Sequence, residues 1–258
     1  MTYFEKFPQI DYRFPDLETK VTDIFRYSQP IKEDLDSVLA FKQYQIVDGE
    51  RPDIVSLKLY NTPDFFWTFF IINDNLREGW HNWPLSFLEK EDYIERYMNF
   101  TIVNTRPGYT LDTDGLIQSS RNNLALSMNV GQHVKGLISK ATGIVRGIIT
   151  ENQQLVIELT GDTDFVANEL IIEESSGDFI ESYEKYEMRS APAYYVDSEG
   201  RKQSNQLFFP TGVSDSELEK ITFEDLLDND IERRSSIKVI HPDYIMEFVD
   251  KFEESIVK

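Results

Sequence analysis

Three stretches of the chain show a spacing of apolar and polar residues that predicts regular structure. In residues 41–47 the two kinds alternate with a period of two, which is typical of a half-buried strand. In residues 244–256 the apolar residues fall on one helical face, and residues 85–97 predict a second amphipathic helix. Because strands and helices occur together, we predict an α+β fold.

Proline marks the starts of two further helices. Arg51-Pro52-Asp53 predicts a helix that runs to residue 59, since Pro is favoured at the first helical position and Asp near the positive end of the helix dipole. Thr62-Pro63-Asp64 repeats the device, with Thr62 as N-cap, before the apolar run 65–72. The composition of that run also suits a buried strand, but the cap favours a helix. Residues 73–79 then end this helix and reverse the chain.

The middle of the chain has a different character. Short apolar runs in residues 130–186 are separated by glycines, which predicts a compact barrel of roughly five strands. Asn152-Gln153 and Gly161-Asp162 are the expected hairpin turns. This block interrupts a helix-rich pattern, so we interpret it as an inserted module.

The chain accordingly divides into four predicted segments. Residues 1–30 form an extended arm, because their prolines forbid a long helix, and its aromatic side chains must pack on the same chain or on a neighbouring subunit. An α+β domain follows in residues 31–105 and the inserted barrel in residues 106–189. Residues 190–258 contain a polar segment expected to wrap over the surface, a short acidic helix from residue 223, a strand at residues 237–240 and the terminal amphipathic helix.

Charge and composition exclude several classes of partner. The chain of 258 residues has 26 basic and 46 acidic side chains, and its formal net charge of -20 opposes binding to nucleic acid or to an anionic membrane. Without cysteine it has no disulfide, thiolate metal site or Cys nucleophile. No apolar run has the length of a membrane span, and the first residues do not predict a signal peptide.

The residue types that carry catalysis do not cluster in the sequence. His81, His133 and His241 lie in three different segments without a metal-binding spacing. Residues 112–115 are similar to half of a calcium loop, but Asn123 stands where the bidentate Glu would fall. Phosphate-loop and serine-elbow motifs are missing, and a carboxylate pair is expected by chance among 46 acids. We therefore predict no catalytic, cofactor-binding or metal-binding residues.

The aromatic stretch at residues 60–84 contains all 3 tryptophans of the chain. So dense a run is either core or an anchor for a partner. The run 65–72 is apolar around more than one helical face, so part of it must be core. Residues 73–84 are expected to form an exposed loop, in which Trp80 and Trp83 either contact a partner or return to the core.

Several short motifs follow one another along the chain: Val21-Thr22-Asp23-Ile24-Phe25-Arg26, Arg51-Pro52-Asp53, the frame of Tyr60, Pro63 and Trp67, Asn73-Asp74-Asn75, Gly79-Trp80, and Ile237-Lys238-Val239-Ile240 with the helix after it. Taken in this order, they resemble one family, the small baseplate wedge protein of T-even-type contractile-tailed bacteriophages (gene product 53 family). Residues 41–84 also resemble the LysM-like module of phage tail proteins. The β module at residues 106–189 has no counterpart in the T-even form.

The resemblance implies a structural subunit that joins neighbouring wedges around the tail hub. Its implied partners are other wedge subunits, neighbouring copies of the wedge, and hub or tube proteins, in the virion baseplate and, during assembly, in the host cytoplasm. The resemblance implies no cofactor. The residues hypothesised to bind partners are Phe25, Arg26, Trp67, Asn73, Asn75, Trp80 and Trp83.

Two alternatives remain at this point. A LysM-type module would bind peptidoglycan through stacked aromatics such as Trp80 and Trp83. A hydrolase would need a pair of carboxylates in unlike environments.

Overall fold

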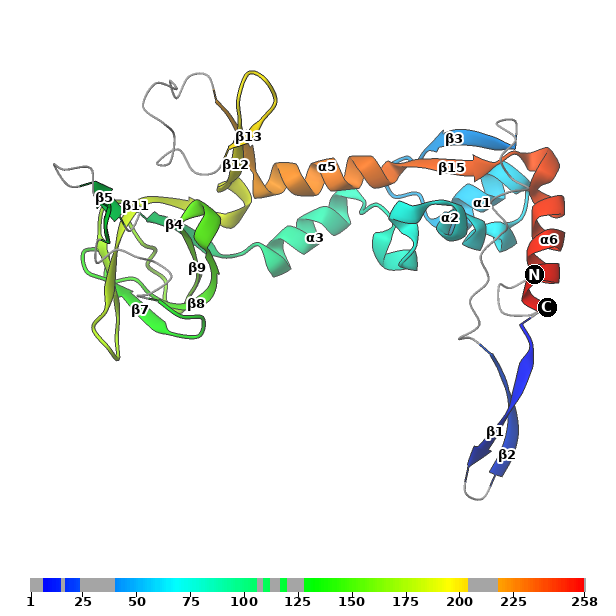
Figure 1. Ribbon diagram of the computed structural model, residues 1–258, viewed down its shortest axis with the longest axis horizontal. Helices are drawn as coiled ribbons and strands as arrows, with labels where there is room; N and C mark the ends of the chain where they lie inside the picture. Colours follow the sequence, from blue (N-terminus) through cyan, green and yellow to red (C-terminus); the bar gives the residue numbers. More distant parts are fainter. Residues whose placement is uncertain are drawn as a thin grey trace. The chain divides into compact units, whose positions relative to one another are not determined.

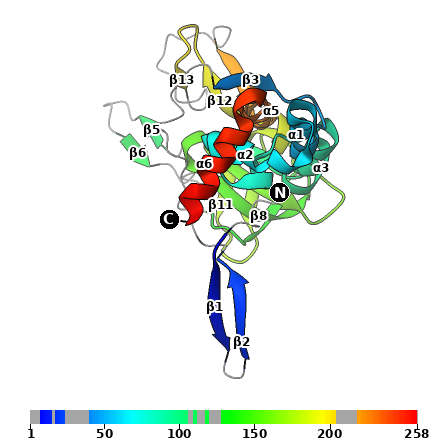
Figure 2. The same ribbon diagram turned by 90° about the vertical axis from the view of Figure 1, so that its right-hand side faces the viewer.

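The computed structural model describes residues 7–14, 17–23, 40–105, 109–111, 117–119, 128–203 and 218–257. The chain forms two compact units, whose elements are drawn in Figures 1 and 2. Unit 1 contains residues 1–89 and 230–258, and unit 2 contains residues 90–229. The chain enters unit 2 within helix α3 (Phe87–Tyr97) and leaves it within helix α5 (Phe223–Ser235). Unit 1 is therefore assembled from two distant stretches of sequence.

A two-stranded sheet joins these two stretches in unit 1. Strand β3 (Phe41–Gln45) pairs antiparallel with β15 (Ser236–Ile240), in a register that sets Phe41 opposite Ile240. Both strands were predicted and are confirmed, but their pairing has no local signal. Helices α1 (Pro52–Tyr60) and α2 (Trp67–Ile72) supply side chains to the same core as the sheet. The buried members of this core are Ile46, Val55, Phe69, Leu76, Trp83, Ile237 and Val239.

The predicted helix starts are confirmed. Pro52 occupies the first turn of α1, which ends at Asn61 in the left-handed conformation with φ of 59°. The hydroxyl of Thr62 accepts a hydrogen bond from the Asp64 amide at 3.3 Å, capping a 3₁₀ helix, Pro63–Phe65, that leads into α2. Pro and a polar cap therefore fix both helix starts locally.

The expected exposed loop at residues 73–84 is wrong. Two 3₁₀ helices, Asp74–Leu76 and Gly79–Asn82, occupy this segment, and Asn73, Leu76 and Trp83 are buried. Asn73 is extended, with φ of -112°, so it does not end α2 in the left-handed region. The strand that pairs with β3 comes from the C-terminal stretch. Residues 73–84 form no strand and contribute the buried side chains of Leu76 and Trp83 to the core.

The C-terminal helix completes a second apolar cluster in unit 1. A 3₁₀ helix, Pro242–Tyr244, follows β15 and leads into α6 (Ile245–Val257). The predicted apolar face is confirmed, except that Tyr244 is exposed. The Trp67 ring of α2 lies 4.8 Å from that of Phe252, so α6 packs directly on the aromatic helix. The buried members are Phe7, Trp67, Ile240, Ile245, Phe248, Val249, Phe252 and Ile256.

The described part of the predicted arm forms a hairpin. Strand β1 (Gln9–Phe14) pairs antiparallel with β2 (Leu17–Thr22). Phe7 precedes the hairpin and is buried in the α6 cluster, so this end of the arm packs on its own chain. Phe25 and Arg26 lie outside the described residues.

A closed antiparallel barrel dominates unit 2, and it has six strands where roughly five were expected. The extra strand is β4, which precedes the predicted module boundary at residue 106 and pairs with both β9 and β11. The sequence β7, β8, β9 forms consecutive antiparallel neighbours, and β10 then returns beside β7 in a Greek key. The strands are β4 (Thr101–Thr105), β7 (His133–Gly136), β8 (Thr142–Ile149), β9 (Gln154–Leu159), β10 (Leu170–Glu173) and β11 (Phe179–Glu187).

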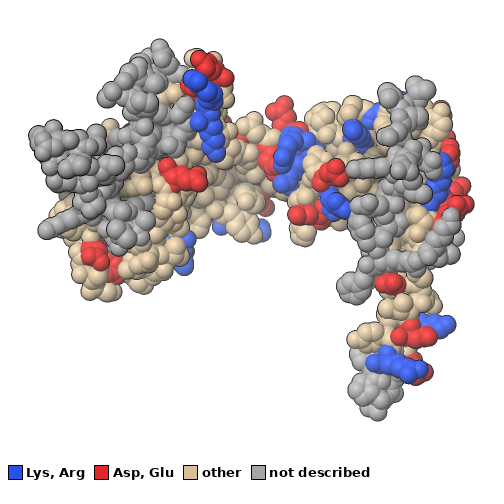
Figure 3. Space-filling view, viewed as in Figure 1, with Lys and Arg blue, Asp and Glu red and all other residues tan. Residues whose placement is uncertain are grey.

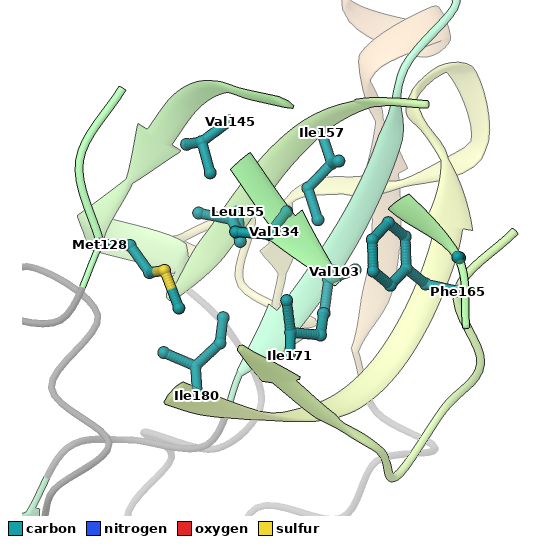
Figure 4. Close-up of a cluster of buried hydrophobic side chains, with 10 residues drawn as sticks. Val103, Met128, Val134, Val145, Leu155, Ile157, Phe165, Ile171 and Ile180 are labelled. Atoms are coloured by element: carbon teal, nitrogen blue, oxygen red, sulfur yellow. The ribbon is translucent and has the colours of Figure 1, made fainter. Parts of the chain in front are cut away.

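The barrel interior is filled by aliphatic side chains with Met128 and Phe165 (Figure 4). Gly143 permits close approach of strands, because a Cβ there would lie 2.4 Å from the Ile157 side chain. The predicted turn at Asn152-Gln153 is confirmed, with Gln153 left-handed between β8 and β9. The turn expected at Gly161-Asp162 does not close a hairpin, since β9 and β10 are not neighbours.

Part of the segment predicted to wrap over the surface is instead a sheet. β12 (Pro192–Val196) lies between β13 (Lys202–Gln203) and β14 (Glu219–Thr222). Two buried barrel amides hold it: Asn152 donates to the Ala193 carbonyl at 2.7 Å and Gln154 to the Pro192 carbonyl at 2.8 Å. A short hairpin joins β5 (Tyr109–Leu111) to β6 (Ile117–Ser119). The calcium-loop candidate at residues 112–115 lies outside the described residues.

Helices α3 and α5 are joined by ion pairs within unit 2. Lys90 reaches Glu224 at 3.2 Å and Asp228 at 2.6 Å, and Arg189 binds the Glu224 carboxylate through two nitrogens at 2.9 Å. These contacts lower the pKa of Glu224, with Arg189 as the largest cause. The predicted α3 helix is confirmed, although its apolar residues Leu88 and Tyr97 are exposed.

We expect Phe252→Ala to destabilise unit 1 by about 3–5 kcal/mol, because it empties the contact between α6 and Trp67. Urea unfolding followed by tryptophan fluorescence measures this, since all 3 tryptophans belong to unit 1. The control is Met246→Ala on the exposed side of the same helix, with an expected change within about 0.5 kcal/mol. Equal effects of the two variants would contradict the packing of α6.

Candidate partner-binding surface

Trp80 is the exposed aromatic residue of the predicted stretch. Half of its surface, 50%, is accessible, although its ring lies 5.8 Å from that of Phe66 and 6.2 Å from that of Phe70. The guanidinium of Arg51 lies 6.0 Å from the ring centroid, within the range of a cation–π contact. A large ring with one face packed on phenylalanines and an accessible remainder has the features of an interface anchor.

Trp83 has the opposite environment. It is only 8% exposed, and its ring lies 6.2 Å from Phe69 and 5.9 Å from Phe70. The indole nitrogen donates a hydrogen bond of 2.6 Å to the Glu50 carbonyl, which fixes the turn between β3 and α1 to the core. The two tryptophans therefore do not form one exposed platform.

Asn73 binds the edge of β15 through its side chain. Its amide nitrogen donates to the carbonyls of Lys238 at 2.9 Å and Phe69 at 2.8 Å. Its amide oxygen accepts a hydrogen bond from the Lys238 backbone N–H at 2.8 Å. The side chain thus pairs with a strand residue as another strand would, and satisfies the outer side of β15 where no third strand lies among the described residues.

The remaining predicted residues differ in accessibility. Trp67 of α2 is buried against α6, which makes it a core residue in this structure. Asn75 is near the surface, where its amide donates to the Arg233 carbonyl at 3.3 Å. Among the predicted residues that the structure describes, Trp80 has the accessible apolar surface that a protein partner needs.

Glu50 is the centre of a polar cluster that the sequence patterns did not indicate. Its carboxylate accepts hydrogen bonds from the Tyr44 hydroxyl at 3.0 Å and the Val47 backbone N–H at 2.9 Å, and pairs with Lys58. Desolvation opposes ionisation, but the Lys58, Val47 and Tyr44 hydrogen bonds outweigh it and lower the pKa of Glu50. Burial, with the adjacent Glu50, raises the pKa of Tyr44 to about 12.

The comparisons with known proteins add one finding. Residues 3–114 match the family model described as base plate wedge protein 53. The matched segment includes Glu50, Trp80 and Trp83, and it ends before most of unit 2 and the C-terminal stretch that completes unit 1. No curated protein matches the chain. The base plate wedge protein 53 match supports a structural role in a phage baseplate.

Neither a metal-holding cluster nor a membrane-spanning helix is found among the described residues. Within them, no group of three or more His, Asp and Glu side chains is arranged to hold a metal ion. None of their helices combines the length and hydropathy needed to span a membrane.

Single replacements of Trp83 and Trp80 will show which of the two rings stabilises the core. We expect Trp83→Ala to lower the free energy of unfolding by about 3–5 kcal/mol, because a buried ring and its hydrogen bond are lost. Trp80→Ala removes a half-exposed ring, and the expected loss is about 1 kcal/mol. Urea unfolding followed by circular dichroism measures both. A loss for Trp80→Ala as large as that for Trp83→Ala would place the Trp80 ring in the core.

The Glu50 cluster predicts a pH dependence of stability. Because folding lowers the pKa of Glu50 below 4.5, its ionised form stabilises the fold above that pH, and this stability is lost as the pH falls through the lowered pKa. We expect Glu50→Gln to reduce the slope of unfolding free energy against pH below about pH 5. Lys58→Met should raise the folded-state pKa of Glu50 toward its unfolded value, which narrows the pH window of this contribution and also weakens the slope. An unchanged profile in both variants would exclude this cluster as a source of acid sensitivity.

Proposed function

We propose that this protein is a structural subunit of a contractile-tail baseplate wedge and that it joins neighbouring wedges around the tail hub. The observation that carries the proposal is the match of residues 3–114 to the base plate wedge protein 53 family. A structural family favours a non-enzymatic role, and it supports a location in the virion tail. Assembly in the host cytoplasm and contact with hub or tube proteins are part of the proposal.

Trp80 is the contact that we assign to wedge joining. Its packed face keeps the ring in one orientation, so little side-chain entropy is lost when a partner covers the accessible part. Unit 1 exposes further apolar surface at Ile54 and Leu57, which lie three residues apart on one side of α1. Asn75 and Trp67 remain partner-binding hypotheses, with Trp67 needing a partner that reaches the α2–α6 contact.

We infer further that the LysM-like module consists of β3, α1, α2 and β15. The strand, helix and helix follow the predicted order, whereas the last element is strand β15 of the C-terminal stretch and not the predicted return within residues 73–84. Unit 2 is then an insertion into the module, between the return segment and the second strand.

The acidic balance supports a partner with basic surface. A net charge of -20 makes two copies of this chain repel, whereas a neighbouring subunit with Lys and Arg at its rim would be attracted. Such complementarity orients the partners and speeds their encounter more than it adds affinity.

The glycan-binding alternative is not favoured. It requires accessible aromatic rings on which sugars stack, and Trp83 is buried with its indole nitrogen bound to Glu50. Trp80 alone provides a smaller platform than the pair that was expected.

A reconstitution of baseplates tests the proposal. Wedge proteins mixed without this chain should give separate wedges in electron micrographs, and adding the chain should give closed baseplates. Trp80→Ala should remain folded and lower the yield of closed baseplates. Tyr244→Ala, a change of another exposed aromatic residue in unit 1, is the matched control and should assemble as the unchanged chain does. Equal closure with and without the chain would refute wedge joining.

A further inference from the structure

The β1–β2 hairpin is amphipathic across its two faces. Residues directly opposite in an antiparallel pair point to the same side, and successive residues alternate sides. Ile10 lies opposite Val21, and Tyr12 opposite Thr19, which puts these four residues on one face. This apolar face is accessible to solvent: Ile10 is 43%, Tyr12 49% and Val21 43% exposed.

The other face is polar and its charges are balanced. Asp11 lies opposite Lys20, and Arg13 opposite Glu18, where the Arg13 Nε lies 2.9 Å from a Glu18 carboxylate oxygen. Charged side chains of both signs follow the ribbon in Figure 3. Cross-strand pairs of opposite charge stabilise a hairpin without a partner. This face is therefore suited to remain in water.

One end of the hairpin is fixed to unit 1. The Asp23 backbone N–H donates to the Pro8 carbonyl at 2.8 Å, which closes the ladder beyond the last strand pair. Phe7 next to it is buried in the α6 cluster. The ribbon has two strands, with no third strand among the described residues. An isolated two-stranded hairpin is at best marginally stable in water, so the exposed side chains of Ile10 and Val21 favour a packing partner.

We propose that the apolar face of the β1–β2 hairpin docks on an apolar groove of a different, basic-rimmed subunit of the assembly. The inference rests on the proposed function, and it assigns a second contact besides Trp80. Two strands of six residues present a face of only about 200 Å², against about 800 Å² per partner in a standard interface. The hairpin therefore reinforces an interface that other surfaces also form.

The same numbers disfavour a second copy of this chain as the occupant. Two such faces would bury too little area for a stable dimer, and two chains of net charge -20 repel each other. A subunit of opposite charge avoids the repulsion, and it can supply the remaining interface area through contacts with other surfaces of this chain.

Cysteine labelling tests the assignment, because the chain has no cysteine of its own. Ile10→Cys reports on the apolar face, and Asp11→Cys, one residue away, is the matched control on the polar face. The rate of maleimide labelling is measured on the isolated full chain and on purified tails that contain it. In tails we expect Ile10→Cys to react at least ~10-fold more slowly than in the isolated chain, as an interface contact of ~1.4 kcal/mol would give. Asp11→Cys should react at similar rates in both.

Four other patterns would overturn the assignment, and a fifth would support it. Similar rates for Ile10→Cys in both samples would show that the face is not docked, and slow labelling of both variants in tails would remove its face specificity. Slow labelling of Ile10→Cys in the dilute isolated chain would place the face on its own chain, and slowing only at high concentration would identify a second copy. If Ile10→Cys is excluded from tails while Asp11→Cys is incorporated, the apolar face is needed for docking.

The opposite strand provides an independent measurement. Val21→Cys should follow Ile10→Cys, and Lys20→Cys should follow Asp11→Cys, since they share the respective faces. Mass spectrometry of the same tails distinguishes a failure of the proposed function from a failure of the hairpin docking. Absence of the unchanged chain from tails would refute the proposed function, whereas its presence with unprotected Ile10→Cys would refute only the docking of the hairpin.

Discussion

The pairing of β3 with β15 is the interaction on which unit 1 depends. It brings together residues 41–45 and 236–240, with the whole of unit 2 between them in sequence. Closing so long a loop costs conformational entropy before any contact is gained. The compensation comes from both sides of β15: Ile237 and Val239 enter the aromatic core, and Ile240 enters the α6 cluster. Asn73 then satisfies the backbone of Lys238 at the strand's outer edge.

Tyr60 and Phe66 connect the two cores of unit 1. Both pack partly against each cluster, and the Tyr60 hydroxyl donates to the Ile240 carbonyl at 2.9 Å. Burial raises the pKa of Tyr60, so this donor keeps its proton at ordinary pH. The aromatic stretch that stands out in the sequence is therefore mostly scaffold. Its most accessible large side chain is Trp80, whose ring packs on Phe66 and Phe70.

The sequence predicted the helix starts and the apolar helix faces, but not which segments pack on one another. Pro52, Thr62 and the apolar face of α6 fix helix starts and orientation through short-range effects, and these predictions are confirmed. Nothing local distinguishes Trp80 from Trp83, because their accessibility depends on how the two 3₁₀ helices fold back on Phe69 and Phe70. Strand β4 was not predicted because all five of its residues are buried, so its sequence shows no alternation of apolar and polar positions. The partner-binding residues remain predictions, apart from where the structure places them.

The insertion of unit 2 into unit 1 determines which unit can fold first during synthesis. Domains generally fold as the chain is synthesised, N-terminal parts first. Here residues 90–229 emerge as a complete unit while β3, α1 and α2 still lack the strand and helix that cover them. Translation that stops before residue 236 leaves Trp67, Phe69 and Ile46 without their covering residues. Such a chain would have a complete barrel in unit 2 and an incomplete core in unit 1.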